Sequence, residues 1–169
     1  MNFSEVSASV SPASSIALNE LVYAKRRQGL DPIILSYGEA PFSPPPFHLS
    51  HDELERGSHY SESRGVPELR RLLAEVHRQK EGVSLDVDEG VMVTAGSKLA
   101  TYLTYISLLN PGDEVLLHEP AWVSYREHAR LVGANVTFVP FDADVSTFLR
   151  ALPQDSRVKL VTLNNPNNP

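Results

Sequence analysis

The chain has 169 residues, 41% of them hydrophobic and 21% charged, and its formal net charge is -6. This composition is typical of one globular domain with a sizeable core, while the negative charge and the lack of a basic run argue against a nucleic-acid partner. The absence of cysteine excludes disulfides, zinc knuckles and a thiol nucleophile. No stretch is apolar enough for a membrane span, and no basic segment precedes an apolar run at the N-terminus. We therefore expect no signal peptide, no membrane partner and a cytoplasmic location.

The first part of the chain predicts an arm, a helix and a short strand. Residues 1 to about 12 are small and polar and are expected to form a mobile arm. Apolar residues at helical spacing predict a helix over Ser15–Gln28, which Gly29 ends. Pro32–Tyr37 is expected to be a strand, and Pro44–Pro46 imposes an extended segment.

Two further helices are expected before the middle of the chain. A polar helix is predicted around Leu49–Arg56, followed by a loop over Tyr60–Gly65. Pro67 suits the first position of a helix that continues to about Lys80 and that Gly82 ends.

The stretch VMVTAGS is the centre of the sequence pattern. Val91–Thr94 predicts a short strand, Ala95-Gly96-Ser97 a tight turn, and the spacing of apolar residues after it a helix from Ser97 to about Leu109. The start of such a helix has backbone N–H groups without intrahelical partners and partial positive charge, so it suits a phosphate. Ser97 adds a hydroxyl and Lys98 a cation. The alternative is an ordinary strand-to-helix turn.

The remaining chain alternates strands with helices. Strands are expected over Glu114–His118, Asn135–Phe141 and Val158–Leu163, and helices over Trp122–Val132 and, capped by Asp144, over Val145–Leu152. Strands that are apolar on both faces and alternate with helices indicate an α/β fold with a parallel sheet covered on both sides. Ligands of such sheets bind beyond the carboxyl ends of the strands. Ser97, Trp122 and Asn168 each follow a predicted strand and are expected on that rim.

Four motifs occur in one order from about Ser11 to Pro169. They are Gly38-Glu39-Ala40-Pro41-Phe42, Tyr60-x4-Gly65-x-Pro67-Glu68-Leu69-Arg70, the stretch VTAGSKLATYLTYISLLNPGDEVLLHEPAWVSYREHARLVGANV, and the terminal NNPNNP. In this order and spacing they resemble the N-terminal portion of the class I/II aminotransferases, pyridoxal 5'-phosphate (PLP) enzymes of fold type I. The resemblance implies an aspartate aminotransferase-like, three-layer α/β/α fold with a mostly parallel sheet, incomplete at the C-terminus.

The resemblance also implies roles for individual residues. Gly96, Ser97 and Lys98 match the turn that holds the PLP phosphate. Trp122 matches the aromatic residue that stacks on the pyridine ring of the cofactor. Asn168 matches the asparagine that donates a hydrogen bond to the cofactor's 3' oxygen.

Two more residues match family positions that contact a neighbouring subunit and the substrate. Tyr60 matches a tyrosine that reaches the phosphate of the neighbouring subunit, so a homodimer is implied. Gly38 matches a backbone contact to the substrate carboxylate. The substrates implied are an amino acid and a 2-oxo acid.

Each of these residues also has a purely structural interpretation. Trp122 is a candidate core residue, Tyr60 a surface loop residue and Lys98 a solvated residue of a first helical turn. Asn168 and Gly38 are compatible with turns alone. The six histidines show no metal-ligand spacing, and we expect no metal site.

The sequence departs from the family pattern after NNPNNP. The family places the aspartate for the pyridine nitrogen, the Schiff-base lysine and the arginine for the substrate α-carboxylate beyond this motif. The lysines present are Lys25, Lys80, Lys98 and Lys159, and none matches the Schiff-base position. We therefore expect no catalytic residue in these 169 residues and no activity of this chain by itself. Relatives often carry a larger side chain at Ala121, so extra room beside the cofactor is expected there.

The sequence is compatible with more than one origin and function of the chain. The chain is interpreted as a fragment, with half of a split protein and a decayed gene as the alternatives. Residues 1–45 are expected to form an arm and the start of a small domain, and residues 46–169 the first part of a large PLP-binding domain. Other PLP enzymes of this fold (lyases, decarboxylases, hydroxylases) and a non-catalytic binding or dimerisation module are alternative functions. A fused DNA-binding regulator is disfavoured because no basic helix is present.

Overall fold

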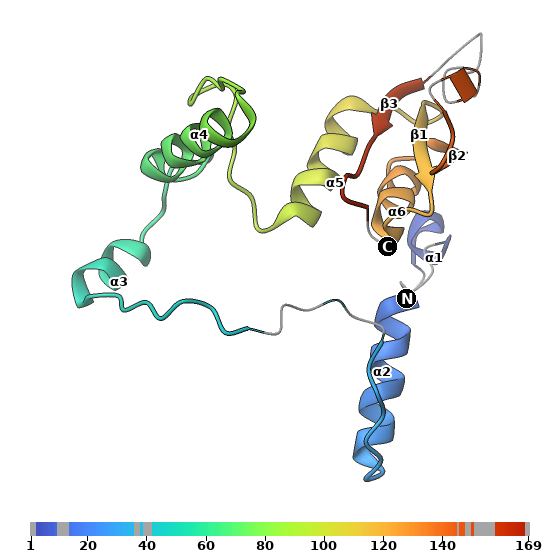
Figure 1. Ribbon diagram of the computed structural model, residues 1–169, viewed down its shortest axis with the longest axis horizontal. Coiled ribbons are helices and arrows are strands. Elements are labelled where there is room, and N and C mark those ends of the chain that lie inside the picture. Colours follow the sequence, from blue (N-terminus) through green and yellow to red (C-terminus); the bar gives the residue numbers. More distant parts are fainter. Residues whose placement is uncertain are drawn as a thin grey trace. The chain divides into compact units, whose positions relative to one another are not determined.

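The computed structural model describes residues 3–9, 14–35, 38, 42–144, 146–147, 150 and 158–167. The chain forms two compact units. The sheet unit comprises Met1–Glu39 and Ala100–Pro169, and the helical unit comprises Ala40–Leu99. Helix α5 (Ser97–Leu108) begins in the helical unit and continues into the sheet unit (Figure 1).

Three parallel strands form the sheet of the sheet unit. They are β1 (Glu114–Glu119), β2 (Asn135–Pro140) and β3 (Val158–Thr162), in the order β2-β1-β3. The register pairs Val115 of β1 with Val136 on one side and Leu160 on the other. Helix α6 (Val123–Leu131) connects β1 to β2, as a parallel pair requires. The predicted parallel sheet and its three strand positions are confirmed.

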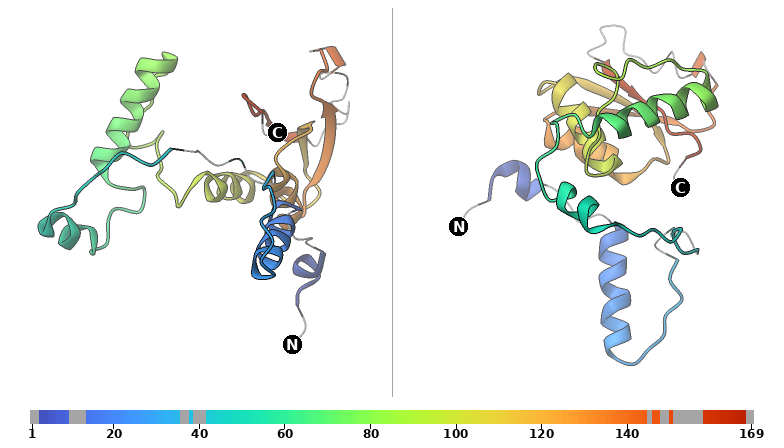
Figure 2. Two further views of the ribbon diagram at one scale, coloured as in Figure 1. Left: turned by 60° about the horizontal axis from the view of Figure 1, so that its bottom comes forward. Right: turned by 90° about the vertical axis from the view of Figure 1, so that its left-hand side faces the viewer.

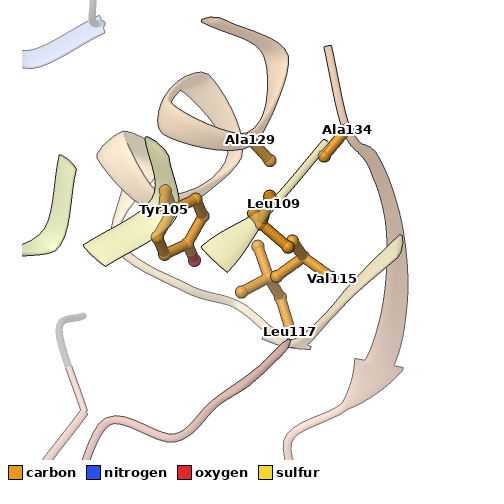
Figure 3. Packing of buried hydrophobic residues seen from close by; sticks show 6 residues of the cluster. All are labelled: Tyr105, Leu109, Val115, Leu117, Ala129 and Ala134. Atoms are coloured by element: carbon orange, nitrogen blue, oxygen red, sulfur yellow. The ribbon is translucent and has the colours of Figure 1, made fainter. Parts of the chain in front are cut away.

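The core of this unit lies between β1 and the two helices α5 and α6. Val115, Leu116 and Leu117 are at most 1% exposed, which fits a central strand covered on both faces. Figure 3 shows the packed cluster, which consists of Tyr105, Leu109, Val115, Leu117, Ala129 and Ala134. Of the apolar residues whose spacing predicted α5, Leu109 meets the central strand, whereas Leu99, Leu103 and Ile106 are 38–52% exposed.

The N-terminal helices belong to the same unit. Helix α2 (Ser14–Arg27) confirms the first predicted helix, and Gly29 follows it with a φ of 78°. Helix α1 (Glu5–Ser9) lies within the stretch expected to be an arm. The Ser4 hydroxyl accepts a hydrogen bond from the N–H of Ser7 at 3.2 Å, which caps that short helix. No helix of the described ranges is both long and apolar enough to cross a membrane.

Two of the predicted strands are wrong. Val91–Thr94 and the described part of the second segment, residues 32–35, have no strand pairing. An apolar, β-branched segment becomes a strand only when a neighbouring strand supplies hydrogen-bond partners, and among the described residues none does so here. Val93 instead donates its N–H to the carbonyl of Arg64 at 2.9 Å.

The helical unit contains α3 (His51–Gly57) and α4 (Pro67–Glu81), as predicted. A capping box starts α3, because Ser50 and Glu53 each accept the other's backbone N–H. Pro67 opens α4, and Gly82 ends it with a left-handed φ of 69°. The chain after α4 returns along the helix to its first turns (Figure 2), where Arg70 hydrogen-bonds to the carbonyl of Val87.

The helix expected after β2 is only partly within the described residues. The Asp144 carboxylate accepts a hydrogen bond from the N–H of Thr147 at 2.6 Å, which is the bond of an N-cap. This bond, more than those from side-chain hydroxyls, lowers the pKa of Asp144. Residues 145, 148–149 and 151–152 of the predicted helix lie outside the described residues.

Candidate functional site

The turn before α5 is shaped by one glycine. Gly96 has a φ of 84°, and an added Cβ there would meet no atom within 4 Å, so the space above the turn is open. Its N–H donates to the carbonyl of Thr94 at 2.7 Å, and the Thr94 hydroxyl donates to the carbonyl of Gly96 at 3.0 Å. These two bonds hold a narrow turn with space for a group above it.

Helix α5 begins directly after this turn, at Ser97. The first turn of the helix contains no acidic residue, and both Ser97 and Lys98 are exposed. Backbone N–H groups, a hydroxyl and an ammonium group are all donors, and the helix dipole adds partial positive charge. The start of α5 is therefore suited chemically to an anion such as a phosphate.

Tyr60 lies in the loop between α3 and α4, in the same helical unit. Its side chain is fully exposed. Further along the loop, Glu62 accepts the N–H of Gly65 through its carbonyl at 2.9 Å, and its carboxylate binds Arg70 at 3.0 Å. The loop is thus held at its base, while Tyr60 projects into solvent.

Trp122 follows β1 and precedes α6 in the sheet unit. The Glu119–Pro120 peptide before it is cis, and the carbonyl of Trp122 accepts the N–H of Tyr125 in the first turn of α6. The Trp122 ring contacts the rings of Tyr125 and His128 edge to face, with centroid distances of 5.3 and 6.3 Å. The indole is thereby held at the carboxyl end of the central strand.

A hollow of about 290 Å³ adjoins this indole. Ala121, Trp122 and Phe138 are among the residues that line it. The small side chain of Ala121 contributes to the open volume, since a larger residue would project into it. The hollow therefore offers a flat aromatic wall within an open surface depression.

The aromatic residues behind Trp122 were not identified from the sequence. His128 is buried and contacts Tyr105 edge to face at 5.8 Å. The Tyr105 hydroxyl hydrogen-bonds to that of Thr162 at 2.8 Å, and burial raises the pKa of Tyr105. The repeated spacing of three residues from Trp122 to Tyr125 to His128 is the sequence signal that would have found this cluster.

The terminal NNPNNP motif lies close to the Trp122 loop. The Asn167 amide donates to the carbonyl of Pro120 at 2.8 Å, and Asn164 donates to Asn167 at 3.4 Å. Sequence reasoning missed Asn167 because the resemblance pointed to its neighbour. Asn168 itself lies outside the described residues.

The predicted site residues are divided between the two units. Gly96, Ser97, Lys98 and Tyr60 belong to the helical unit. Trp122 belongs to the sheet unit, as does Gly38, which is exposed. Each unit therefore carries its own part of the predicted site.

The sequence model for aminotransferases of class I and II matches residues 31–169. The aspartate/prephenate aminotransferase of Thermus thermophilus is 36% identical over 94% of this chain and 43% of its own length. The arginine–pyruvate transaminase of Pseudomonas aeruginosa is 35% identical over 86% of this chain and 39% of its own length.

A solved structure supports the same relationship. The aspartate aminotransferase from Thermus thermophilus with maleate superposes with a TM-score of 0.89 and 34% identity, over 100% of this chain and 46% of that chain. The chain belongs to the class I and II aminotransferase family. It spans less than half the length of these relatives. The predicted family, its N-terminal portion and the aspartate aminotransferase-like fold are thus confirmed.

Proposed function

We propose that this chain is the PLP-binding N-terminal part of an aminotransferase that transfers an amino group between an amino acid and a 2-oxo acid. Family membership over residues 31–169 supports this assignment, because the enzymes of the family are PLP-dependent. The single observation that carries it is the start of α5, where an open turn at Gly96 leads into a helix without acidic residues in its first turn.

The phosphate of the cofactor is assigned to Gly96, Ser97 and Lys98. The donors present there fit a phosphate, because the turn provides helix N–H groups, a hydroxyl and a cation, and because a Cβ at Gly96 would occupy open space. A phosphate dianion at a helix start accepts hydrogen bonds from all three kinds of donor. The role of these residues is to bind and orient the phosphate.

The ring of the cofactor is assigned to Trp122 and Asn168. Trp122 offers a flat face beside an open hollow, and its ring is held by Tyr125 and His128. Asn168 is assigned the hydrogen bond to the 3' oxygen. The neighbouring Asn167, which is bonded to Pro120, ties this end of the chain to the loop that carries Trp122. Bound PLP supplies an electron sink at the substrate α-carbon.

Tyr60 and Gly38 complete the proposed site. The exposed Tyr60 is suited to reach a neighbouring subunit, and we assign it to the phosphate held there in a homodimer. Gly38 is assigned a backbone contact to the substrate carboxylate. The proposal keeps the division into residues 1–45 and 46–169 as the start of a small domain and the first part of a large one. The protein is proposed to act in the cytoplasm, in amino acid biosynthesis.

The substrate pair is left as a class. One relative is an aspartate/prephenate aminotransferase, another an arginine–pyruvate transaminase and a third an LL-diaminopimelate aminotransferase, all at 31–36% identity. These relatives are named for different substrates although their sequence identities to this chain are similar. Sequence identity alone therefore does not indicate which substrate this protein uses. The hollow beside Ala121 is the place where we expect the side chain of this protein's substrate to be selected.

Cofactor binding is testable through Trp122, because it is the only tryptophan of the chain. We expect PLP to quench its fluorescence saturably, and pyridoxal, which lacks the phosphate, to bind about tenfold more weakly or worse. Ser97→Ala should weaken binding of PLP only, whereas Ser58→Ala, at the exposed end of α3, should change neither ligand. Equal binding of PLP and pyridoxal would contradict the phosphate site.

The expected inactivity of this chain has a separate test. None of its four lysines matches the anchoring position of the family, so we expect PLP to be held without a covalent bond. Borohydride reduction of the PLP-loaded chain, followed by mass spectrometry, should give no stoichiometric adduct on one lysine. Such an adduct, or amino-group transfer by the isolated chain from a panel of amino acids to 2-oxo acids, would contradict this part of the proposal.

A further inference from the structure

Arg70 is the most buried charged residue of the described chain, with 3% of its surface exposed. It is the fourth residue of α4 and makes four hydrogen bonds through its guanidinium group. Burial of a guanidinium group is costly unless its donors are paired. The acceptors are the carbonyls of Gly65 and Val87 at 3.2 and 2.8 Å, and the carboxylates of Asp88 and Glu62 at 3.1 and 3.0 Å.

These four acceptors come from two separate loops. Glu62 and Gly65 belong to the Tyr60–Gly65 loop, and Val87 and Asp88 to the turn that follows α4. The second loop has its own bracing, because the Asp86 carboxylate accepts the N–H groups of Asp88 and Glu89, both at 2.8 Å. Arg70 therefore joins two loops that are distant in sequence. Arg64 makes a second link between them, because it donates to the carbonyl of Asp88 and pairs with Glu89 at 3.3 Å.

The Tyr60–Gly65 loop in turn holds the segment that leads to the phosphate turn. The carbonyl of Arg64 accepts the N–H of Val93 at 2.9 Å. Gly65 lies so close to Val93 that a Cβ added to it would come within 2.6 Å of the Val93 Cβ. Val91–Thr94 has no strand pairing among the described residues, so this hydrogen bond and close contact are what tie Val93 to the loop, three residues before Gly96.

We propose that Arg70 is a positioning residue that places the Tyr60 loop and the Gly96–Ser97 turn relative to each other and thereby sets the affinity for a phosphate group. This inference rests on the proposed function of that turn. The Arg70 side chain is buried but its two carboxylate partners are exposed, so the ion pairs are weak evidence for stability. They nevertheless impose a particular geometry, because the planar guanidinium group requires each acceptor at a defined place. All the contacts involved lie within residues 62–93 of one unit.

The test compares Arg70→Lys with a matched control, Arg78→Lys. Both arginines lie on α4, but Arg78 pairs with Glu75 on the exposed surface. A lysine ammonium cannot reproduce the forked geometry at position 70. In the full chain we expect Arg70→Lys to lower the affinity for PLP about tenfold and to leave the affinity for pyridoxal nearly unchanged. Arg78→Lys should leave both affinities unchanged. A general loss of structure would lower both affinities together, and that result would overturn the proposal.

A second variant covers the case in which Arg70→Lys does not fold. Glu62→Ala removes only the exposed carboxylate that ties the loop to Arg70, and it should shift the ratio of the two affinities in the same direction, about threefold. An unchanged ratio in this variant would overturn the proposal.

A double variant separates this inference from the proposed function. If Arg70 acts through the turn, Arg70→Lys should have no further effect on PLP affinity once Ser97→Ala is present. Additive losses would overturn the inference and leave the phosphate site intact. If the unaltered chain binds PLP no more tightly than pyridoxal, the proposed function fails and the inference fails with it.

Discussion

The sheet unit and the helical unit are each stabilised internally by a different kind of interaction. In the sheet unit, apolar side chains from α5, α6 and β1 form a cluster with almost no exposed surface. In the helical unit, the buried residues of the described chain are Arg70 and Ala74, and the loops are fixed by hydrogen bonds from two guanidinium groups, those of Arg70 and Arg64. The sheet unit therefore depends on close packing of apolar side chains, and the helical unit on hydrogen bonds and backbone geometry.

The two units also differ in how their helices use an apolar face. Tyr105 of α5 and Leu109, which directly follows the helix, are buried against β1. On α4, by contrast, Leu69, Leu72 and Val76 have the spacing of a core face and yet remain 42–61% exposed. An amphipathic helix therefore gains stability from its pattern only where a partner surface is present.

The largest effect is expected in the sheet unit. Leu117 is 1% exposed at the centre of the apolar cluster, so Leu117→Ala should destabilise the unit by roughly 2–5 kcal/mol through lost burial and a residual cavity. Urea unfolding followed by circular dichroism measures this loss. Leu108→Ala, at a site that is 55% exposed, should cost less than about 1 kcal/mol. An equal loss of stability in the two variants would contradict the assignment of Leu117 to the core and Leu108 to the surface of this unit.

An intermediate effect is expected at a backbone position of the helical unit. Gly65 has a φ of 101°, and a Cβ there would meet Val93 at 2.6 Å, so Gly65→Ala should cost roughly 1–3 kcal/mol. Hydrogen exchange of the Val93 N–H, which is bonded to Arg64, should accelerate in this variant. Gly57→Ala is the control, because a Cβ at Gly57 meets no atom within 4 Å. Unchanged exchange at Val93 would show that the loop does not hold this segment.

The smallest effect is electrostatic and lies on the exposed surface of α4. Hydrogen bonds from Arg78 and then Gln79 lower the pKa of Glu75 from its ordinary value of 4.5 to about 2. Because the folded-state pKa is the lower one, the contribution to stability is present above pH 4.5 and is lost as the pH falls through 2. An NMR titration of the Glu75 carboxyl carbon measures this pKa.

Two variants and added salt test which interactions lower the pKa of Glu75. Arg78→Gln should raise the pKa of Glu75 more than Gln79→Ala does, because the arginine makes the larger contribution. Added salt should also raise it, since exposed ion pairs are screened. A Glu75 pKa near 4.5 in the unaltered chain would show that this surface network does not form in solution.

Local sequence signals predicted the elements that carry their own start and stop. Pro67 and Gly82, both recognised in the sequence, bound α4, because these residues act on the backbone within one helical turn. The capping box of Ser50 and Glu53 at the start of α3 is equally local but was recognised only in the structure. The apolar strand β1 was also predictable, since its partners β2 and β3 lie within the chain and its burial follows from its composition. The resemblance to the aminotransferases likewise depended on short motifs of residues that are neighbours along the chain.

Other features required the folded chain. Val91–Thr94 has the composition of a strand, but strand formation depends on a neighbour, and the segment is instead held by Arg64. Nothing in the sequence around Arg70 indicates burial, because its farther acceptors lie 17 and 18 residues away. The aromatic support behind Trp122 likewise forms only when α6 packs beside Tyr105.

Residues that are neighbours along the chain were enough to indicate the family, most of the helices, the three paired strands and the small-residue turn at Gly96. Which charged side chain is buried, which apolar faces are covered and which loop supports the turn became clear only from the folded chain. Those properties depend on contacts between segments that are distant in sequence. The free energy of such contacts cannot be inferred from a local sequence pattern.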